Sequence, residues 1–420
     1  MFAVGTAIFF LAYAAIVSER VHRTTVALTG AALMIVFGVI AQSDAITAID
    51  FNTIGLLIGM MIIVSITKHT GLFQYVAIRA AQVAKGEPWL ILLALSLITA
   101  VFSSVLDNVT TILLIGPVTF VIASNLKISP IPFLIAEIIL ANLGGGASLV
   151  GDPVNILVGS AAELTFLDFL TNAAPIILIM IPVVLLIFKL RYGSQLQTTE
   201  ELKQSILEFN ALSAIKDKDL LIKSLLVLGI VVIGFLLHGV IHLQPATIAL
   251  FGASLLLVIS GHNPEKILEE LEWTTILFFA GLFILVAGIE EIGLIDMFAD
   301  TLLSITEGEA AATTMAIFWG AGLFSGVVDN LPFAATMIPV VQELGAAGVP
   351  IDQLWWALIF GAILGGNATL IGASTNLVAA GLAERSGYHL GFKEFFKVGS
   401  IVMIVTMLIT TVYIYLRYLM

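Results

Sequence analysis

Apolar runs long enough to cross a lipid bilayer recur along the whole chain. Crossing the hydrocarbon core takes roughly 20 residues of helix, and the backbone must satisfy its own hydrogen bonds there. The runs lack the period-two alternation of a membrane β-barrel. Of the 420 residues, 60% are apolar and 11% are charged, whereas soluble domains carry roughly 25% charged residues. The sequence therefore predicts an all-α polytopic membrane protein in contact with the lipid bilayer.

The composition also excludes several classes of function. The chain has no cysteine, so it forms neither a disulfide nor a thiolate metal site. Its formal net charge of -12 disfavours nucleic acid as a partner. The phosphate-binding loop of ATPases, the H-E-x-x-H motif and the G-x-S-x-G motif are missing from the sequence. We expect no enzyme activity, no cofactor and no resident metal ion.

An internal repeat organises these apolar runs. Shifting the chain by 222 residues aligns Gly, Asp, Asn and Pro, which chance matching of abundant Leu and Ala would not select. The aligned pairs are Gly30 and Gly252, Gly59 and Gly281, Gly71 and Gly293, Asp107 and Asp329, Asn108 and Asn330, and Pro117 and Pro339. After one deletion the shift becomes 221 and aligns Gly144 with Gly365, Gly151 with Gly372, and Asn155 with Asn376.

The repeat sets the predicted domain organisation. The first repeat covers 1–190 and contains a re-entrant hairpin at 89–124 and a broken helix at 131–160. A cytoplasmic linker covers 191–222. The second repeat covers 223–420, with a hairpin at 311–342 and a broken helix at 353–383. Each repeat has about five crossings plus its hairpin, and an odd number of crossings inverts one repeat relative to the other, as in many secondary transporters.

The distribution of Lys and Arg predicts the orientation. With both termini outside the cell, nearly all basic residues lie in the cytoplasm, including Arg20, Arg23 and the linker cations, and only Arg417 lies outside. This arrangement obeys the positive-inside rule. We expect a multi-pass protein of the cytoplasmic membrane with the linker 191–222 inside.

Four carboxylates lie within apolar stretches, at Asp107, Glu137, Asp152 and Asp329. An acidic residue at the centre of a membrane helix costs about 2.5–3.5 kcal/mol, so these residues are candidates for coupling protons. The sequence suggests no Lys or Arg at the same depth to pair with them. A structural role, in which the carboxylate caps a broken helix, is the alternative for each.

Two glycine-rich segments, 144–155 and 365–376, interrupt apolar runs with hydroxyl and amide residues. Unwound backbone at membrane depth must line a cavity or be buried in protein, and its free carbonyls can bind a cation. Close helix packing is the competing explanation for the glycines. The candidate substrate- or ion-binding residues are Asp107, Asn108, Thr110, Gly151, Asp152, Asn155, Asp329, Asn330, Thr369, Ser374, Thr375 and Asn376.

At these residues the chain resembles the ion transporter superfamily, in the branch of arsenical pump membrane proteins, the P protein and NhaD-type sodium/proton antiporters. The matching segments are 107–110, 151–155, 329–332 and 372–376. The resemblance spans nearly the whole chain. It implies a scaffold that carries a homodimer contact, and a transport module of two hairpins and two broken helices that moves like an elevator.

The resemblance leaves the substrate open. Related carboxylate transporters carry Ser-Asn-Thr at the hairpin tips, whereas both tips here read Asp-Asn, which disfavours an anion. Proton-coupled efflux of arsenite or antimonite is the first expectation, with Asn108, Asn155, Asn330, Thr369 and Asn376 recognising the neutral hydroxide. Na⁺/H⁺ antiport is the second. Carboxylate transport, a channel, and a membrane subunit that works with a separate ATPase are further alternatives.

Overall fold

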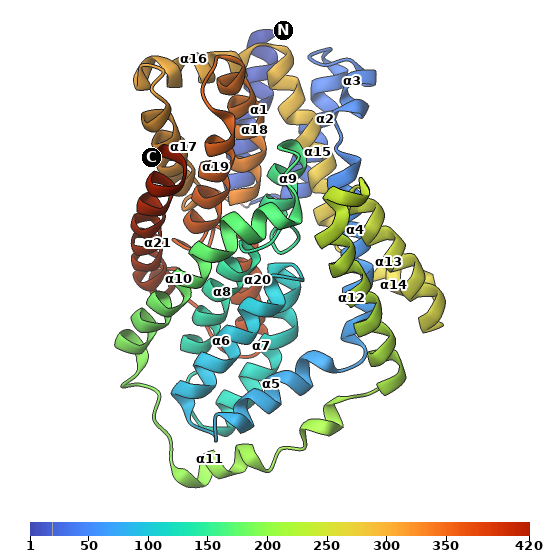
Figure 1. Cartoon of the computed structure of the whole chain (residues 1–420), viewed down its shortest axis with the longest axis vertical. Coiled ribbons are helices and arrows are strands. Elements are labelled where there is room, and N and C mark those ends of the chain that lie inside the picture. Colours follow the sequence, from blue (N-terminus) through green and yellow to red (C-terminus); the bar gives the residue numbers. More distant parts are fainter. Residues whose placement is uncertain (19) are drawn as a thin grey trace.

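The computed structural model describes residues 1–18 and 20–420, and most of this part of the chain is helical (Figure 1). The helices of the first half are α1 (Phe2–Ser18), α2 (Arg23–Val36), α3 (Gln42–Thr47), α4 (Phe51–Lys68), α5 (Leu72–Val83), α6 (Pro88–Ser103), α7 (Asn108–Asn125), α8 (Ile131–Gly145), α9 (Pro153–Ala161) and α10 (Phe166–Tyr192). The all-α prediction is confirmed.

A linker and the second half follow. The linker contains α11 (Glu200–Leu207) and a short 3-10 turn (Ala211–Ala214). The helices of the second half are α12 (Lys218–Ile241), α13 (Pro245–Ser260), α14 (Pro264–Glu269), α15 (Trp273–Glu291), α16 (Leu294–Thr306), α17 (Ala310–Ser325), α18 (Asn330–Ala346), α19 (Ile351–Gly365), α20 (Ser374–Arg385) and α21 (Phe392–Ile414), whose end continues into a π-helical turn (Tyr415–Leu419).

The two halves share one plan. Helices α2 and α13, α4 and α15, α6 and α17, and α7 and α18 begin 222 residues apart, and α9 and α20 begin 221 residues apart. In Figure 1 the hairpin α6–α7 lies in the lower half and α17–α18 in the upper half, with α9 and α20 between them. The repeats are therefore inverted, and each contributes one hairpin and one discontinuous helix.

The linker differs by a few residues from its predicted bounds, 191–222. Helix α10 continues to Tyr192, and α12 begins at Lys218. The side chain of Asp217 caps α12 by accepting a hydrogen bond of 2.9 Å from the backbone N–H of Leu220, so the polar residues that follow it form the first turn of a helix. Figure 1 shows α11 and the N-terminus at opposite ends of the molecule.

Helix length alone does not separate the crossings from the broken elements, because α7 of the first hairpin is long and helices α1, α2 and α13 are short. Within the described residues, six helices are long and apolar enough to cross a membrane, namely α4, α7, α10, α12, α15 and α21 with its final turn. Helices α6, α8, α17 and α19 are apolar but have only 15 or 16 residues each. Short apolar helices of this kind suit hairpins and half-helices that stop inside the protein.

Glycines bring the hairpins against the broken helices. A Cβ added at Gly144 would overlap the carbonyl oxygen of Ala100, and one added at Gly365 would overlap that of Gly322, at the equivalent place in the second repeat. Helices α6 and α8, and α17 and α19, therefore touch through their backbones. The packing explanation holds for these glycines, while the chain between α8 and α9 and between α19 and α20 is unwound as well. We call the unit α6–α9 with α17–α20 the inner unit, and α1, α2, α4, α12, α13 and α15 the outer helices.

Candidate functional site

Four helix N-termini from the two repeats meet at a small cavity of about 50 Å³. Helices α7, α9 and α18 each begin after an aspartate, and α20 begins at Ser374. The positive ends of the helix dipoles favour negative charge at this point. The cavity is lined by Arg23, Asp107, Asn108, Asp152, Glu272 and Ser374, among others.

Asp107 and Asp152 form the acidic side of the cavity. Asp107 caps α7 by accepting a hydrogen bond of 2.8 Å from the N–H of Thr110, and Asp152 caps α9 by accepting one of 2.8 Å from Val154. The amide of Asn108 donates to Asp152 Oδ2 at 2.6 Å. Among the described residues, no Lys or Arg forms a salt bridge with either carboxylate. Asp107 and Asp152 therefore each cap a helix and also line the cavity.

Asp329 has a basic partner, which corrects the expectation that no Lys or Arg lies beside these acids. Arg23 Nη1 lies 2.7 Å from Asp329 Oδ2 and also donates to Ser374 Oγ. Ser374 Oγ donates to the same carboxylate oxygen at 2.8 Å. Because Arg23 follows the apolar helix α1, the sequence placed it in a cytoplasmic loop, whereas the fold brings it to the tip of the second hairpin.

Two asparagines hold the unwound segments by identical contacts. Asn155 Nδ2 donates to the carbonyl oxygens of Gly145 at 3.2 Å and Ser148 at 2.7 Å. Asn376 Nδ2 donates to the equivalent oxygens of Gly366 and Thr369, both at 2.8 Å. These amides satisfy backbone carbonyls that the broken helices leave free. Their donors are therefore directed into the protein rather than toward the cavity.

The hydroxyl groups of Ser148 and Thr369 also make equivalent contacts in the two repeats. Ser148 Oγ donates to the carbonyl oxygen of Ser104, and Thr369 Oγ1 donates to the equivalent oxygen of Gly326 at 2.8 Å. Each contact ties an unwound segment to the turn of the hairpin in the same repeat. The hairpin tip and the broken helix thus form one hydrogen-bonded unit.

Asn142 links the two repeats and was not predicted. Its amide donates to Asn367 Oδ1 at 3.0 Å and to Asn376 Oδ1 at 3.1 Å. It is buried in α8, within an apolar run. A lone Asn in such a run is a signal that would have identified it, because a buried amide needs partners.

Other predicted residues lie at or beside the cavity. Asn330 and Thr375 line it, and the N–H of Asn330 donates to the carbonyl oxygen of Gly372 at 3.1 Å. Gly151 sits where an added Cβ would come within 2.5 Å of the oxygen of Ser103. Thr110 contributes its N–H to the Asp107 cap.

Glu137 lies apart from this cavity. It is fully buried in α8, and Thr119 Oγ1 donates to its Oε1 at 2.5 Å. In the described part of the chain its Oε2 has no hydrogen-bond partner. The structure therefore brings Asp107, Asp152 and Asp329 together and leaves Glu137 separate from them.

Glu272 and Arg23 are the charged cavity residues that the sequence prediction missed. Glu272 is the repeat equivalent of Asp50, and both acids precede the first turn of a helix, α15 and α4. Glu272 Oε2 accepts a hydrogen bond of 3.1 Å from Thr275. Alignment of these acids by the repeat was the signal available in the sequence.

Larger cavities lie near the site. One of about 400 Å³ shares Arg23, Glu272 and Ser374 with it and extends beside the turn between α1 and α2. Another, of about 340 Å³, lies toward the other end of α15, where Glu290 lines it. The central cavity and the 400 Å³ cavity therefore share the start of α15, and the 340 Å³ cavity lies further along this helix.

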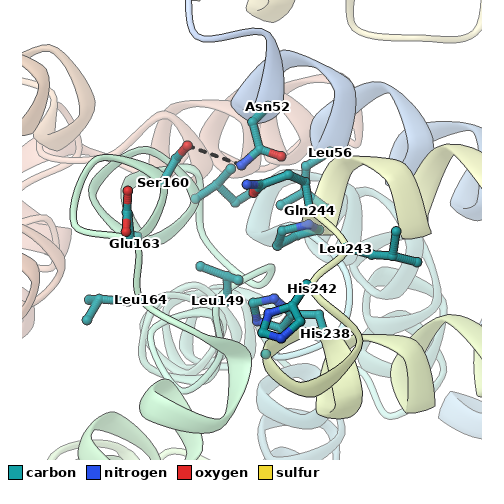
Figure 2. Close-up of a pocket in the computed structure, with 14 residues that line it drawn as sticks. Asn52, Leu56, Leu149, Ser160, Glu163, Leu164, His238, His242, Leu243 and Gln244 are labelled. Carbon is teal, nitrogen blue, oxygen red and sulfur yellow. Dashed lines mark hydrogen bonds between the residues drawn. The ribbon is translucent and has the colours of Figure 1, made fainter.

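A further cavity, of about 390 Å³, separates outer helices from α9 (Figure 2). Figure 2 shows Asn52 bonded to Ser160, a contact of 3.2 Å, and His238 and His242 also line the cavity. His238 Nε2 accepts a hydrogen bond of 3.0 Å from the N–H of Phe166, at the start of α10. A few specific hydrogen bonds thus join α4 and α12 to the inner unit and to α10.

The central cavity offers carboxylate, amide and hydroxyl oxygens as possible ligands. In the described part of the chain it is lined by the carboxylates of Asp107, Asp152 and Glu272 and by the guanidinium of Arg23. Carboxylate, amide and hydroxyl oxygens are donors that hard cations prefer. Within residues 1–18 and 20–420, no three His, Asp or Glu side chains gather as a multi-ligand metal site would require.

Comparison with known proteins places the chain among transporters. A family model described as CitMHS, citrate transporter, matches residues 13–361. An uncharacterized transporter of Mycobacterium tuberculosis is 42% identical over 425 residues, covering 100% of this chain and 99% of the relative. The human P protein is 36% identical over 488 residues, covering 96% of this chain and 58% of the P protein.

A solved structure supports the fold. The YdaH transporter of Alcanivorax borkumensis matches with a TM-score of 0.56 and 14% identity, covering 89% of this chain and 86% of that one. This likeness concerns the fold alone. Together with the helices long enough to cross a membrane, these matches describe a multi-pass transporter of small substrates, and the resemblance to the ion transporter superfamily is confirmed: the chain belongs to the CitMHS citrate transporter family.

Proposed function

We propose that this chain is a secondary active transporter that exchanges a small monovalent cation for protons at the cavity between the two hairpin tips. One observation carries the proposal. Asp107 and Asp152 line a cavity of about 50 Å³ without a salt bridge to Lys or Arg among the described residues, and the amide of Asn108 binds Asp152. Such a pair attracts a cation or takes up protons.

Competition between the cation and protons for the same carboxylate oxygens would account for their exchange. A cation bound by Asp107 and Asp152 and a proton on either carboxylate exclude one another, so loading one ion on each side of the membrane couples their movements. Neutralised carboxylates also lower the cost of moving the inner unit through the bilayer. We propose that the inner unit moves against the outer helices, as the resemblance implies.

Purified protein in liposomes tests this function. A proton gradient is imposed, a pH-sensitive dye is enclosed, and Na⁺, Li⁺, K⁺ or choline is added outside. We expect proton movement with a small alkali cation and none with choline, and rates at least about tenfold lower in Asp107→Asn and Asp152→Asn. Asp300→Asn, which changes an exposed carboxylate of α16, is the matched control. Equal rates with choline would disprove cation exchange.

Proton-coupled carboxylate transport is the second candidate, because Arg23 lines the cavity. A guanidinium binds carboxylates in a bidentate manner, and the family description names citrate. Adding citrate to the same liposomes distinguishes the two. If citrate drives proton uptake and Arg23→Gln abolishes that uptake, carboxylate transport is the function and cation exchange is rejected.

Arsenite or antimonite efflux, with protons as the coupling ion, is tested by the same protein. The amides expected to recognise the neutral hydroxide, Asn155 and Asn376, bind backbone carbonyls instead, which weakens this reading relative to cation exchange. Growth of an arsenite-sensitive host carrying the chain measures it. If the chain confers arsenite resistance and Asp107→Asn removes that resistance, metalloid efflux is the main function.

The remaining expectations concern partners and orientation. Activity in liposomes without ATP or a second protein would exclude dependence on a separate ATPase. Light scattering of the detergent-solubilised protein measures whether it is the homodimer that the resemblance implies. Accessibility of cysteines introduced at the termini and at 195 tests whether both termini lie outside and the linker inside.

A further inference from the structure

The ion pair of Arg23 and Asp329 joins the outer helices to the inner unit. Arg23 begins α2, and its guanidinium lies 2.7 Å from the carboxylate that caps α18. The same nitrogen contacts Ser374 at the start of α20. Phe278 of α15 lies under the guanidinium, whose central carbon is 5.0 Å from the ring centroid. The outer helices α2 and α15 thus hold the positively charged guanidinium of Arg23 in place.

The first repeat lacks this arrangement. The equivalent of Asp329 is Asp107, and the equivalent of Arg23 is Pro245, which has no charge to offer. Asp107 accepts a hydrogen bond from the N–H of Thr110, and its carboxylate borders the cavity. Asp107 lines the central cavity and Asp329 lines the neighbouring cavity of about 400 Å³. Of these two repeat-related carboxylates, Asp329 alone is paired with a basic side chain among the described residues.

We propose that the Arg23 guanidinium is a tethered cation that occupies a second cation-binding position, formed by Asp329 and Ser374. The oxygens that hold the guanidinium, a carboxylate and a hydroxyl, also suit Na⁺ or Li⁺. This inference rests on the proposed cation exchange and adds a second site to it. The ligand is a small monovalent cation.

Movement of the inner unit would alternate the occupant. Arg23 is on an outer helix, whereas Asp329 and Ser374 travel with the inner unit, so a displacement of several ångströms breaks the pair. The freed carboxylate then binds a cation from solution. When the inner unit returns, the guanidinium competes for the same oxygens and expels that cation.

Tyr13 marks the same boundary. Its hydroxyl contacts the carbonyl oxygen of Pro332 and Thr336 Oγ1, both on α18. Helices α1 and α2 therefore hold the hairpin tip by Tyr13 on one side and Arg23 on the other. The contacts of Tyr13 and Arg23 thus join α1 and α2 to α18 and its N-terminal cap.

Cation binding to purified variants tests the proposal. Thermal stability is followed while Na⁺, Li⁺ or K⁺ is titrated, with choline keeping the ionic strength constant. The background is Asp107→Asn with Asp152→Asn, which removes the carboxylates of the first repeat. We expect no cation-specific stabilisation in this background, its appearance when Arg23→Gln is added, and its loss when Asp329→Asn is added as well.

The size of the effect follows from competition. A tethered cation bound nine-tenths of the time raises the apparent Kd for a free one about tenfold. Arg23→Gln alone should therefore lower the apparent KM for the cation by about tenfold. It should also lower the turnover, because no guanidinium is left to displace the bound cation from Asp329. Arg23→Lys keeps a charge and should behave more like the native protein.

Two results would overturn the proposal. One is Arg23→Gln with native cation affinity and turnover, and the other is stabilisation that persists after Asp329→Asn is added. If the variants with three or more changes do not fold, the single variants Arg23→Gln and Ser374→Ala decide by KM and turnover. Failure of cation exchange in the native protein would instead refute the proposed function, so the two failures are distinct.

Discussion

Asn142 of the first repeat donates a hydrogen bond of 3.1 Å to Oδ1 of Asn376 in the second. Asn376 in turn holds the unwound segment of its own repeat through Gly366 and Thr369. One amide therefore connects the two broken helices at the centre of the inner unit.

Asn142→Leu should destabilise the protein by about 1–3 kcal/mol, because two buried amide oxygens lose their donor. Thermal denaturation in detergent measures this change. Asn125→Ala removes an exposed amide at the end of α7 and should change the midpoint little. Equal effects of the two changes would show that the link between repeats is not important for stability.

Gly71→Ala should detach the linker from the membrane part. Gly71 has φ of +82°, and an added Cβ would overlap the carbonyl oxygen of Ala214 in the linker. The next linker contact, from the N–H of Lys216 to the oxygen of Thr70 at 2.9 Å, should be lost with it. Limited proteolysis at the linker lysines measures the change.

Gly293→Ala is the matched control. Gly293 is the repeat equivalent and has φ of +74°, but the nearest atom to an added Cβ is 3.5 Å away. Both changes carry the cost of a left-handed conformation, about 1–2 kcal/mol. Only Gly71→Ala should accelerate cleavage of the linker, and equal cleavage in both variants would contradict the predicted clash.

Glu270 should make stability depend on pH. Burial raises the pKa of its carboxyl, but the hydrogen bonds from Lys68 and Ser65 and the nearby charges of Lys68 and His69 outweigh it, and the pKa falls below its usual 4.5. Lys68 Nζ lies 2.6 Å away. A lowered pKa contributes stability that is complete above pH 4.5 and is lost as the pH falls through the folded value.

Glu270→Gln should therefore lower the thermal midpoint at pH 7 and have little effect near pH 3. The exposed neighbour Glu269→Gln is the control, because it takes part in no ion pair among the described residues. A Glu270→Gln deficit that stays constant from pH 7 to pH 3 would exclude the carboxylate charge as its cause.

Glu137→Gln should retain cation exchange within about twofold, while Asp152→Asn loses it. The reason is position, since Asp152 lines the cavity and Glu137 is enclosed between α7 and α8 with Thr119 as its partner. The liposome assay compares the two variants. Loss of exchange in folded Glu137→Gln would mean that a proton passes through α8.

The repeat alone predicted which residues of the candidate site occupy equivalent positions in the two halves. Asp107 and Asp329, Asn155 and Asn376, and the glycines beside them align in the sequence and occupy equivalent places in the structure. What could not be predicted depends on contacts between distant segments. Arg23 meets Asp329 across 306 positions, and its place after an apolar helix resembled an ordinary loop end.

The direction in which a side chain points could not be predicted from the sequence either. Asn155 and Asn376 looked like ligands for a substrate, yet their donors point at backbone carbonyls. A sequence shows that an amide lies in an unwound segment but not which way it faces. The start of α12 was also placed too late, since Lys218 and its polar neighbours resemble a linker until Asp217 is seen to cap them.

The separation of Arg23 from Asp329 has an electrical consequence. If α2 stays fixed while the inner unit moves, the carboxylates of Asp107, Asp152 and Asp329 cross part of the membrane field without the guanidinium. Each unbalanced charge crossing the full field responds with about 2.3 kcal/mol per 100 mV. The empty carrier should therefore be biased by membrane voltage toward the positive side, and the loaded carrier, whose carboxylates are neutralised, should be far less sensitive to it.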